Sequence, residues 1–146
     1  MHGSYTSTFN LPVFSWRSTL SSNVFHSSPR ISVVGLPAEL SFSLLTYGFA
    51  LANLARSTLF SLGAYEHERH LTDTERRVKD EKLSFAVNLL CRASGVYLHI
   101  AEVVLPQWEM ANPQPSIAIP DLNKAVITSL SQYAHHPTFC VSQKKN

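Results

Sequence analysis

The sequence is poor in the residues and motifs that mark secreted proteins and enzymes. Its 146 residues include only two cysteines, Cys91 and Cys140, which lie far apart in sequence and show no disulfide framework, so we expect reduced thiols. Twelve basic and ten acidic side chains nearly cancel, which excludes a charge-driven attraction to nucleic acid or anionic lipid as the main interaction. No Gly-rich phosphate loop, Gly-x-Ser-x-Gly elbow or paired-carboxylate pattern appears, so we expect no catalytic residue and no cofactor.

Targeting and membrane signals are also missing. The N-terminus, beginning Met1-His2-Gly3, has no basic segment followed by an apolar one, as a secretory signal requires. The longest uncharged apolar stretch, residues 40–55, is shorter than the roughly 20 residues of a membrane span and contains Ser and Thr. We therefore expect a cytoplasmic protein with no transmembrane segment, in which residues 40–55 belong to a buried helix.

Apolar residues make up 45% of the chain, which is sufficient for a core, and their spacing predicts a first helix at about residues 37–62. Pro37 suits the first turn of this helix, and Gly63 suits the position after its last turn. Most of its circumference is apolar, so the helix needs neighbours on more than one side. Its polar residues gather in one narrow stripe on the helical wheel: Glu39, Ser43, Thr46, Asn53, Ser57 and Ser61.

A second helix is predicted at about residues 73–104. Thr72 and Glu75 have the spacing of a capping box at its start, and Pro106 predicts its end near Val104. From Leu83 onward this helix is also apolar over most of its circumference. Its polar stripe consists of Ser84, Asn88, Cys91, Gly95, His99 and Glu102.

The predicted fold is all-α, an antiparallel hairpin of these two helices with a third helix from about residue 121. Residues 1–28 are predicted to be irregular, with one short helix near 16–21, and residues 30–34 to be a strand or extended lead-in too short to found a sheet. We place the helical domain at 29–132, with a crossing loop at 112–120, and expect a divergent tail at 133–146.

Two clusters were weighed as metal sites. Glu66, His67, Glu68 and His70 lie close together, but their spacing is not that of the helical zinc motif, and a solvated loop is favoured. A second cluster would need a fourth ligand from elsewhere: His135, His136 and Cys140. We expect neither to bind metal.

A catalytic thiol was weighed in the same way. Cys91 and His99 share the polar stripe of the second helix, yet two turns separate them by about 12 Å, so a catalytic pair is disfavoured.

Four separated segments of the chain share a pattern with a known family: Phe14-Ser15-Trp16-Arg17, residues 36–55, residues 91–100 and Pro120-Asp121-Leu122-Asn123. In this order they resemble the BRO domains of endosomal-sorting adaptors related to Alix. The fungal pH-response regulators of that family are the most similar in Trp16-Arg17-Ser18-Thr19 and Leu54-Ala55-Arg56-Ser57.

The resemblance implies a partial BRO-type helical solenoid. Its implied role is that of a non-enzymatic cytoplasmic adaptor in ambient (alkaline) pH signalling and endosomal sorting, recruited to the plasma membrane or endosome. The implied partner is a helix of an ESCRT-III subunit.

The chain departs from the family pattern at Tyr133, where the family helix continues into hairpins that carry the partner-binding patch. We therefore expect a domain truncated after about residue 132. No partner-binding residue can be assigned by resemblance, and we expect weak or no binding of the ESCRT-III helix.

Two alternatives remain open. One is a helical structural protein that self-associates through its exposed apolar helix faces. The other, less favoured, is a small metal- or thiol-dependent enzyme that uses His67, His70 and Cys91.

Overall fold

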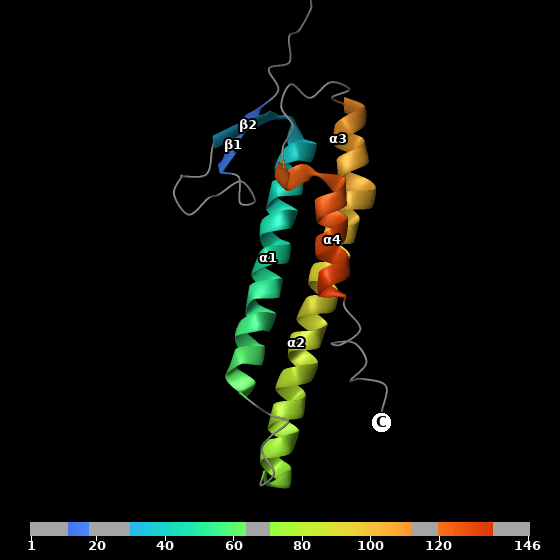
Figure 1. The fold of residues 1–146 in the computed structure, drawn as a ribbon. Helices are drawn as coiled ribbons and strands as arrows, with labels where there is room; N and C mark the ends of the chain where they lie inside the picture. Colours follow the sequence, from blue (N-terminus) through green and yellow to red (C-terminus); the bar gives the residue numbers. More distant parts are fainter. Residues whose placement is uncertain (1–11, 18–29, 64–70, 112–119, 136–146) are drawn as a thin grey trace, which may run out of the picture.

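The fold is predominantly α-helical, as predicted. The computed structural model describes residues 12–17, 30–63, 71–111 and 120–135. The two long helices α1 and α2 form the antiparallel hairpin that the sequence predicts, and α4 runs beside it (Figure 1). In chain order the elements are β1 Val13–Arg17, β2 Arg30–Val34, α1 Leu36–Leu62, α2 Asp73–His99, the π-helix η2 Ile100–Val104, α3 Leu105–Ala111, the 3₁₀-helix η3 Pro120–Leu122 and α4 Lys124–Ala134.

Local signals in the sequence set both ends of α1 as predicted. Pro37 lies in the first turn, where a missing N–H removes no helical hydrogen bond. Gly63 follows the last turn with φ 64°, a backbone conformation that favours glycine. The predicted polar stripe of α1 faces solvent, apart from the half-buried Glu39.

The predicted capping box starts α2. The Thr72 hydroxyl accepts a hydrogen bond from the Glu75 backbone N–H at 3.3 Å, and the Thr72 backbone N–H donates to Glu75 Oε2 at 2.9 Å. These bonds satisfy two backbone donors that have no partner within the helix. The predicted polar stripe of α2 is exposed along its whole length.

The predicted stop at Pro106 is wrong. The chain continues from α2 through η2 into α3, and the Leu105 backbone N–H donates to the carbonyl of Ile100, five residues earlier. A proline inside an α-helix clashes with the carbonyl four residues before it, and a wider π-turn directly upstream changes that spacing. The elements α2, η2 and α3 thus form one continuous helical rod, here called the second rod, which is several residues longer than predicted.

The N-terminal prediction is also corrected. Residues 13–17, predicted to be irregular and to run into a helix near 16–21, form β1, which pairs antiparallel with β2 in a two-stranded sheet. Residues 18–29 lie outside the described part. Ile31 and Val33 alternate inward as a strand requires, and both belong to the core. The sheet forms because its apolar face packs on the helices rather than standing alone.

One aromatic residue holds this sheet against α1. The Trp16 ring stacks on Phe42 with 5.2 Å between ring centroids and an interplanar angle of 11°. Its Nε1–H donates to Glu39 Oε2 at 2.7 Å, which satisfies the indole donor.

The third helix differs from the prediction at both ends. Residues 120–122 form the 3₁₀-helix η3, and α4 begins after Asn123, whose Oδ1 accepts from the N–H groups of Ala125 and Val126. The predicted tail begins two residues too early, because α4 continues to Ala134 and the His135 N–H donates to the Ser131 carbonyl. Residues 136–146 lie outside the described part.

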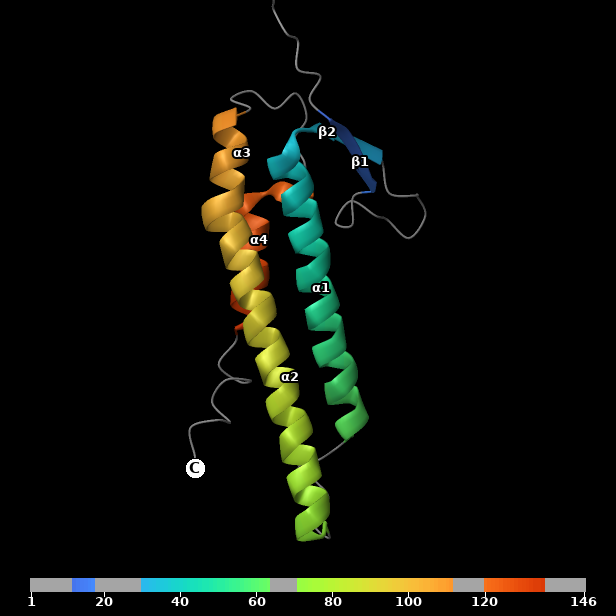
Figure 2. The same ribbon diagram turned by 180° about the vertical axis from the view of Figure 1, so that it is seen from behind.

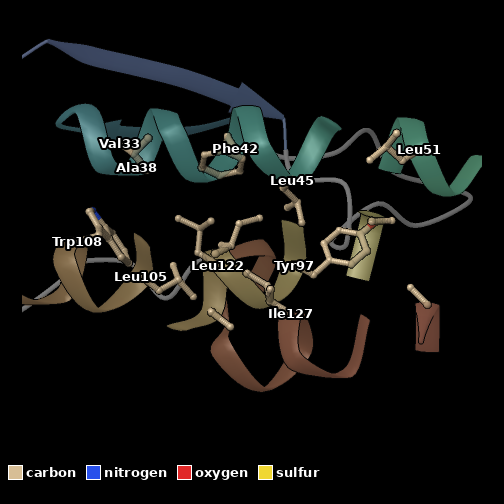
Figure 3. Packing of buried hydrophobic residues seen from close by; sticks show 14 of the residues in the cluster. Val33, Ala38, Phe42, Leu45, Leu51, Tyr97, Leu105, Trp108, Leu122 and Ile127 are labelled. Atoms are coloured by element: carbon tan, nitrogen blue, oxygen red, sulfur yellow. The ribbon is translucent and has the colours of Figure 1, made fainter. Parts of the chain in front are cut away.

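The core lies between α1, the η2–α3 end of the second rod, and η3 with α4. Phe42 and Leu45 of α1 point toward Trp108, Leu105 and Ile127 across this space (Figure 3). The two opposite views show α4 alongside the half of the hairpin nearer the sheet (Figures 1 and 2). The other half of the hairpin extends past the end of α4.

Candidate functional site

The residues that the sequence offered for chemistry form no site in the described part of the chain. Cys91 and His99 are exposed on α2, and His135 lies at the end of α4. No group of three or more His, Cys, Asp or Glu side chains that could hold a metal occurs among the described residues. The loop cluster with His67 and His70, as well as His136 and Cys140, falls outside that part.

The described residues enclose an apolar groove of about 770 Å³. It lies where α1 and α2 continue beyond α4, with the last turn of α4 closing one end. We call it the α4-end groove. Its lining comes from α1 and its cap (Phe49, Ala52, Asn53, Arg56, Leu59, Phe60 and Gly63), from α2 (Leu90 and Tyr97) and from α4 (Leu130, Tyr133 and Ala134).

Tyr97 forms the inner wall of the groove. Its side chain is 2% exposed, and its ring contacts Phe49 edge to face with 5.9 Å between centroids. The ring occupies the space that a side chain at Gly48 would take, since a Cβ there would lie 2.5 Å from Tyr97 Cε1. Burial raises the pKa of the Tyr97 hydroxyl to about 12, so the wall is uncharged at physiological pH.

The open rim of the groove carries large exposed rings. Phe60 is 72% exposed and Tyr133 is 80% exposed, although both line the groove. Exposed aromatic side chains beside an apolar hollow are typical of a protein-binding surface.

Arg56 is the one charged residue among the described residues that line the groove. Its guanidinium lies over the Phe60 ring, 5.3 Å from the centroid. The site therefore combines an apolar floor with a single positive charge at the rim, which favours a ligand with an apolar face and a carboxylate beside it.

A buried polar contact fixes the position of α4 and hence the end of the groove. The Ser94 hydroxyl donates to the Ser131 backbone carbonyl at 3.0 Å, and the Ser131 hydroxyl donates to the Ser94 carbonyl at 3.1 Å. Both serines are buried, and their small side chains let α2 and α4 approach closely. Leu130 and Tyr133 are thereby held at the edge of the groove.

The lengths of the helices explain why the groove exists. At 1.5 Å per residue the 27 residues of α1 extend about 40 Å, whereas the 11 residues of α4 extend about 16 Å. The stretch of α1 that lines the groove, from Phe49 to Gly63, corresponds to about 21 Å. A further helix of about four turns would match this length.

The second rod, Asp73–Met110, has 38 residues and is long and apolar enough to cross a membrane by length and composition alone. In the structure 44% of its most apolar 18-residue stretch is buried, because α1 and α4 pack against it.

The groove was not predicted from the sequence, and the reason is physical. The periodicity identified Phe49, Leu59 and Phe60 as apolar, but it could not show that α4 covers only half of the hairpin. The absence of the family's partner-binding patch stays a prediction, because that patch was expected in hairpins beyond Tyr133, whereas the α4-end groove is lined by α1, α2 and α4.

Comparison with known proteins gives one curated relative. The chain is 38% identical over 104 residues to the pH-response regulator protein palC of Cryptococcus neoformans var. neoformans serotype D (strain B-3501A). The match covers 67% of this chain and 21% of that protein, so the chain spans about a fifth of its relative. No protein-family model and no solved structure matches the chain. The match supports the relationship to fungal pH-response regulators that the sequence segments suggested.

Proposed function

We propose that this chain is a non-enzymatic adaptor of the BRO type that acts in the response to ambient alkaline pH. The observation that carries the proposal is the 38% identity to a pH-response regulator over most of the chain's length. The predominantly helical fold agrees with a scaffold role.

The α4-end groove is the proposed contact site for a partner helix. Its length suits about four helical turns, its floor is apolar, and helix-in-groove recognition places apolar residues at i, i+4 and i+7 into such a surface. Arg56 at the rim favours a partner that carries a carboxylate next to its apolar stripe. We propose the C-terminal helix of an ESCRT-III subunit as the partner and the plasma membrane or endosome as the place of recruitment.

Calorimetric titration of the 146-residue chain with a peptide of that helix tests the contact. We expect saturable binding with a dissociation constant on the order of micromolar, weakened at least about tenfold by Phe60→Ala. Phe85→Ala is the matched control, because Phe85 is also an exposed aromatic residue but lies on α2 outside the groove. Equal affinity of the two variants would exclude the groove as the binding site.

The pH-response role needs a separate test in cells. Deletion of the gene should impair growth at alkaline pH and leave growth at acidic pH unchanged, and the intact gene should restore it. Growth that is equally affected at both pH values would contradict the proposed role.

A further inference from the structure

The outward face of α1 carries a second exposed surface, separate from the groove, on which large apolar side chains alternate with alanine and with serines of the polar stripe. Every third or fourth residue from Leu36 to Ser61 falls on this surface, about 150° around the helix from the centre of the α4-end groove. Its large members, all exposed by 43 to 68%, are Leu36, Leu40, Tyr47 and Leu54. Its small members, also exposed, are Ser43, Ala50, Ser57 and Ser61. We call this surface the outward stripe.

We propose that the outward stripe binds the outward stripe of a second copy of this chain, with the two α1 helices antiparallel. The spacing of alternately three and four residues is that of a helix-pairing seam. A two-fold axis that passes between Gly48 and Phe49 makes the contact isologous, so that each residue of the stripe meets a different residue of the second copy.

The order of large and small side chains fits this one occupant. With the axis between Gly48 and Phe49, Leu36 faces Ser61 and Leu40 faces Ser57 of the second copy. Ser43 likewise faces Leu54. The central layer pairs Tyr47 with Ala50. A large side chain thus meets a small one in every layer, which is the condition for close packing of two facing helices.

The charge pattern of the stripe is also compatible with antiparallel pairing of two α1 helices. None of the eight positions of the stripe is charged, so the two-fold axis brings no like charges together within the seam. Tyr47 reaches the edge of the stripe, where its hydroxyl accepts a hydrogen bond from Arg92 Nη2 at 2.8 Å. The Arg92 side chain is thereby held beside α1 at the border of the proposed contact.

The size of the contact predicts its strength. The stripe is about 38 Å long and about 10 Å wide, so it offers about 380 Å² from each copy, which is less than most stable dimers bury. We therefore expect a weak dimer whose population depends on protein concentration. This surface is independent of partner binding in the α4-end groove.

Sedimentation equilibrium of the 146-residue chain over a wide concentration range tests the proposal. We expect a monomer–dimer equilibrium, with a dissociation constant raised at least about tenfold by Leu54→Glu. Arg56→Glu is the matched control, because Arg56 is exposed on the same helix about 160° around from Leu54. A monomer at every concentration, or a dimer broken by Arg56→Glu and not by Leu54→Glu, would overturn the proposal.

A swap of residues tests the register. Ser43→Leu should weaken the dimer, because it places two leucines in one layer, and addition of Leu54→Ser should restore it. Both substitutions lie at exposed positions, and circular dichroism checks that the helices persist. Failure of the second substitution to restore dimerisation would exclude this register.

Discussion

At the residue scale, the Tyr97 ring fills the space that a Cβ at Gly48 would occupy. We expect Gly48→Ala to destabilise the fold by about 1–3 kcal/mol, because the added methyl group has no room and the gain in helix propensity is smaller. Gly95 is the matched control, since a Cβ there meets nothing within 4 Å. Gly95→Ala should stabilise by about 0.5–1 kcal/mol. Chemical denaturation measures both, and equal effects would contradict the described packing of Tyr97.

The buried Tyr97 hydroxyl makes the stability of the fold depend on pH. Its pKa is raised to about 12 in the folded state, above the usual value of 10.0, because burial disfavours the charged phenolate. A raised pKa contributes stability that is complete below pH 10 and is lost as the pH rises toward 12. Thermal melts between pH 8 and about 12 should therefore show a loss that Tyr97→Phe reduces. An identical profile for the two proteins would refute a buried hydroxyl.

At the scale of single elements, the capping box stabilises the first turn of α2. Thr72→Ala removes the acceptor for the Glu75 N–H, so we expect a loss of about 1 kcal/mol in the free energy of unfolding. Thr74 is the control, because it is exposed in the first turn and is not the capping residue. If Thr74→Ala costs as much as Thr72→Ala, the capping role is refuted.

The elements also show what the sequence could predict. Caps and breakers act locally, so the start of α2 at the Thr72–Glu75 box and the end of α1 at Gly63 were predicted correctly. The sheet and the π-helix depend on distant contacts. β1 pairs with a strand that begins 13 residues after its last residue, and its Trp16 rests on α1. Pro106 is accommodated by the π-helix η2, which the residues around Pro106 do not predict.

At the scale of the whole molecule, the predicted excess of apolar helix surface is present. Leu36, Phe60, Phe85 and Met110 each remain more than half exposed in the monomer. Periodicity could predict that two faces of each helix are apolar, but not which face stays uncovered, because that depends on the length and position of α4.

The charge at the groove rim allows a separate prediction for the whole complex. If a carboxylate of the partner helix meets Arg56, Arg56→Glu should weaken peptide binding about tenfold or more, because it replaces attraction by repulsion. Arg30→Glu is the control, since Arg30 is an exposed residue of β2 outside the groove lining. Calorimetry at low and high salt should show that only the wild-type affinity and that of the Arg30 variant fall with salt.

The central claim is that the α4-end groove receives a partner helix, and chemical-shift mapping by NMR of the isotope-labelled chain tests it most directly. On addition of the ESCRT-III helix peptide, we predict the largest shifts at groove residues from all three helices, including Arg56, Tyr97 and Tyr133, with little change along the outward stripe. Shifts confined to the outward stripe, or no shifts at saturating peptide, would contradict the account.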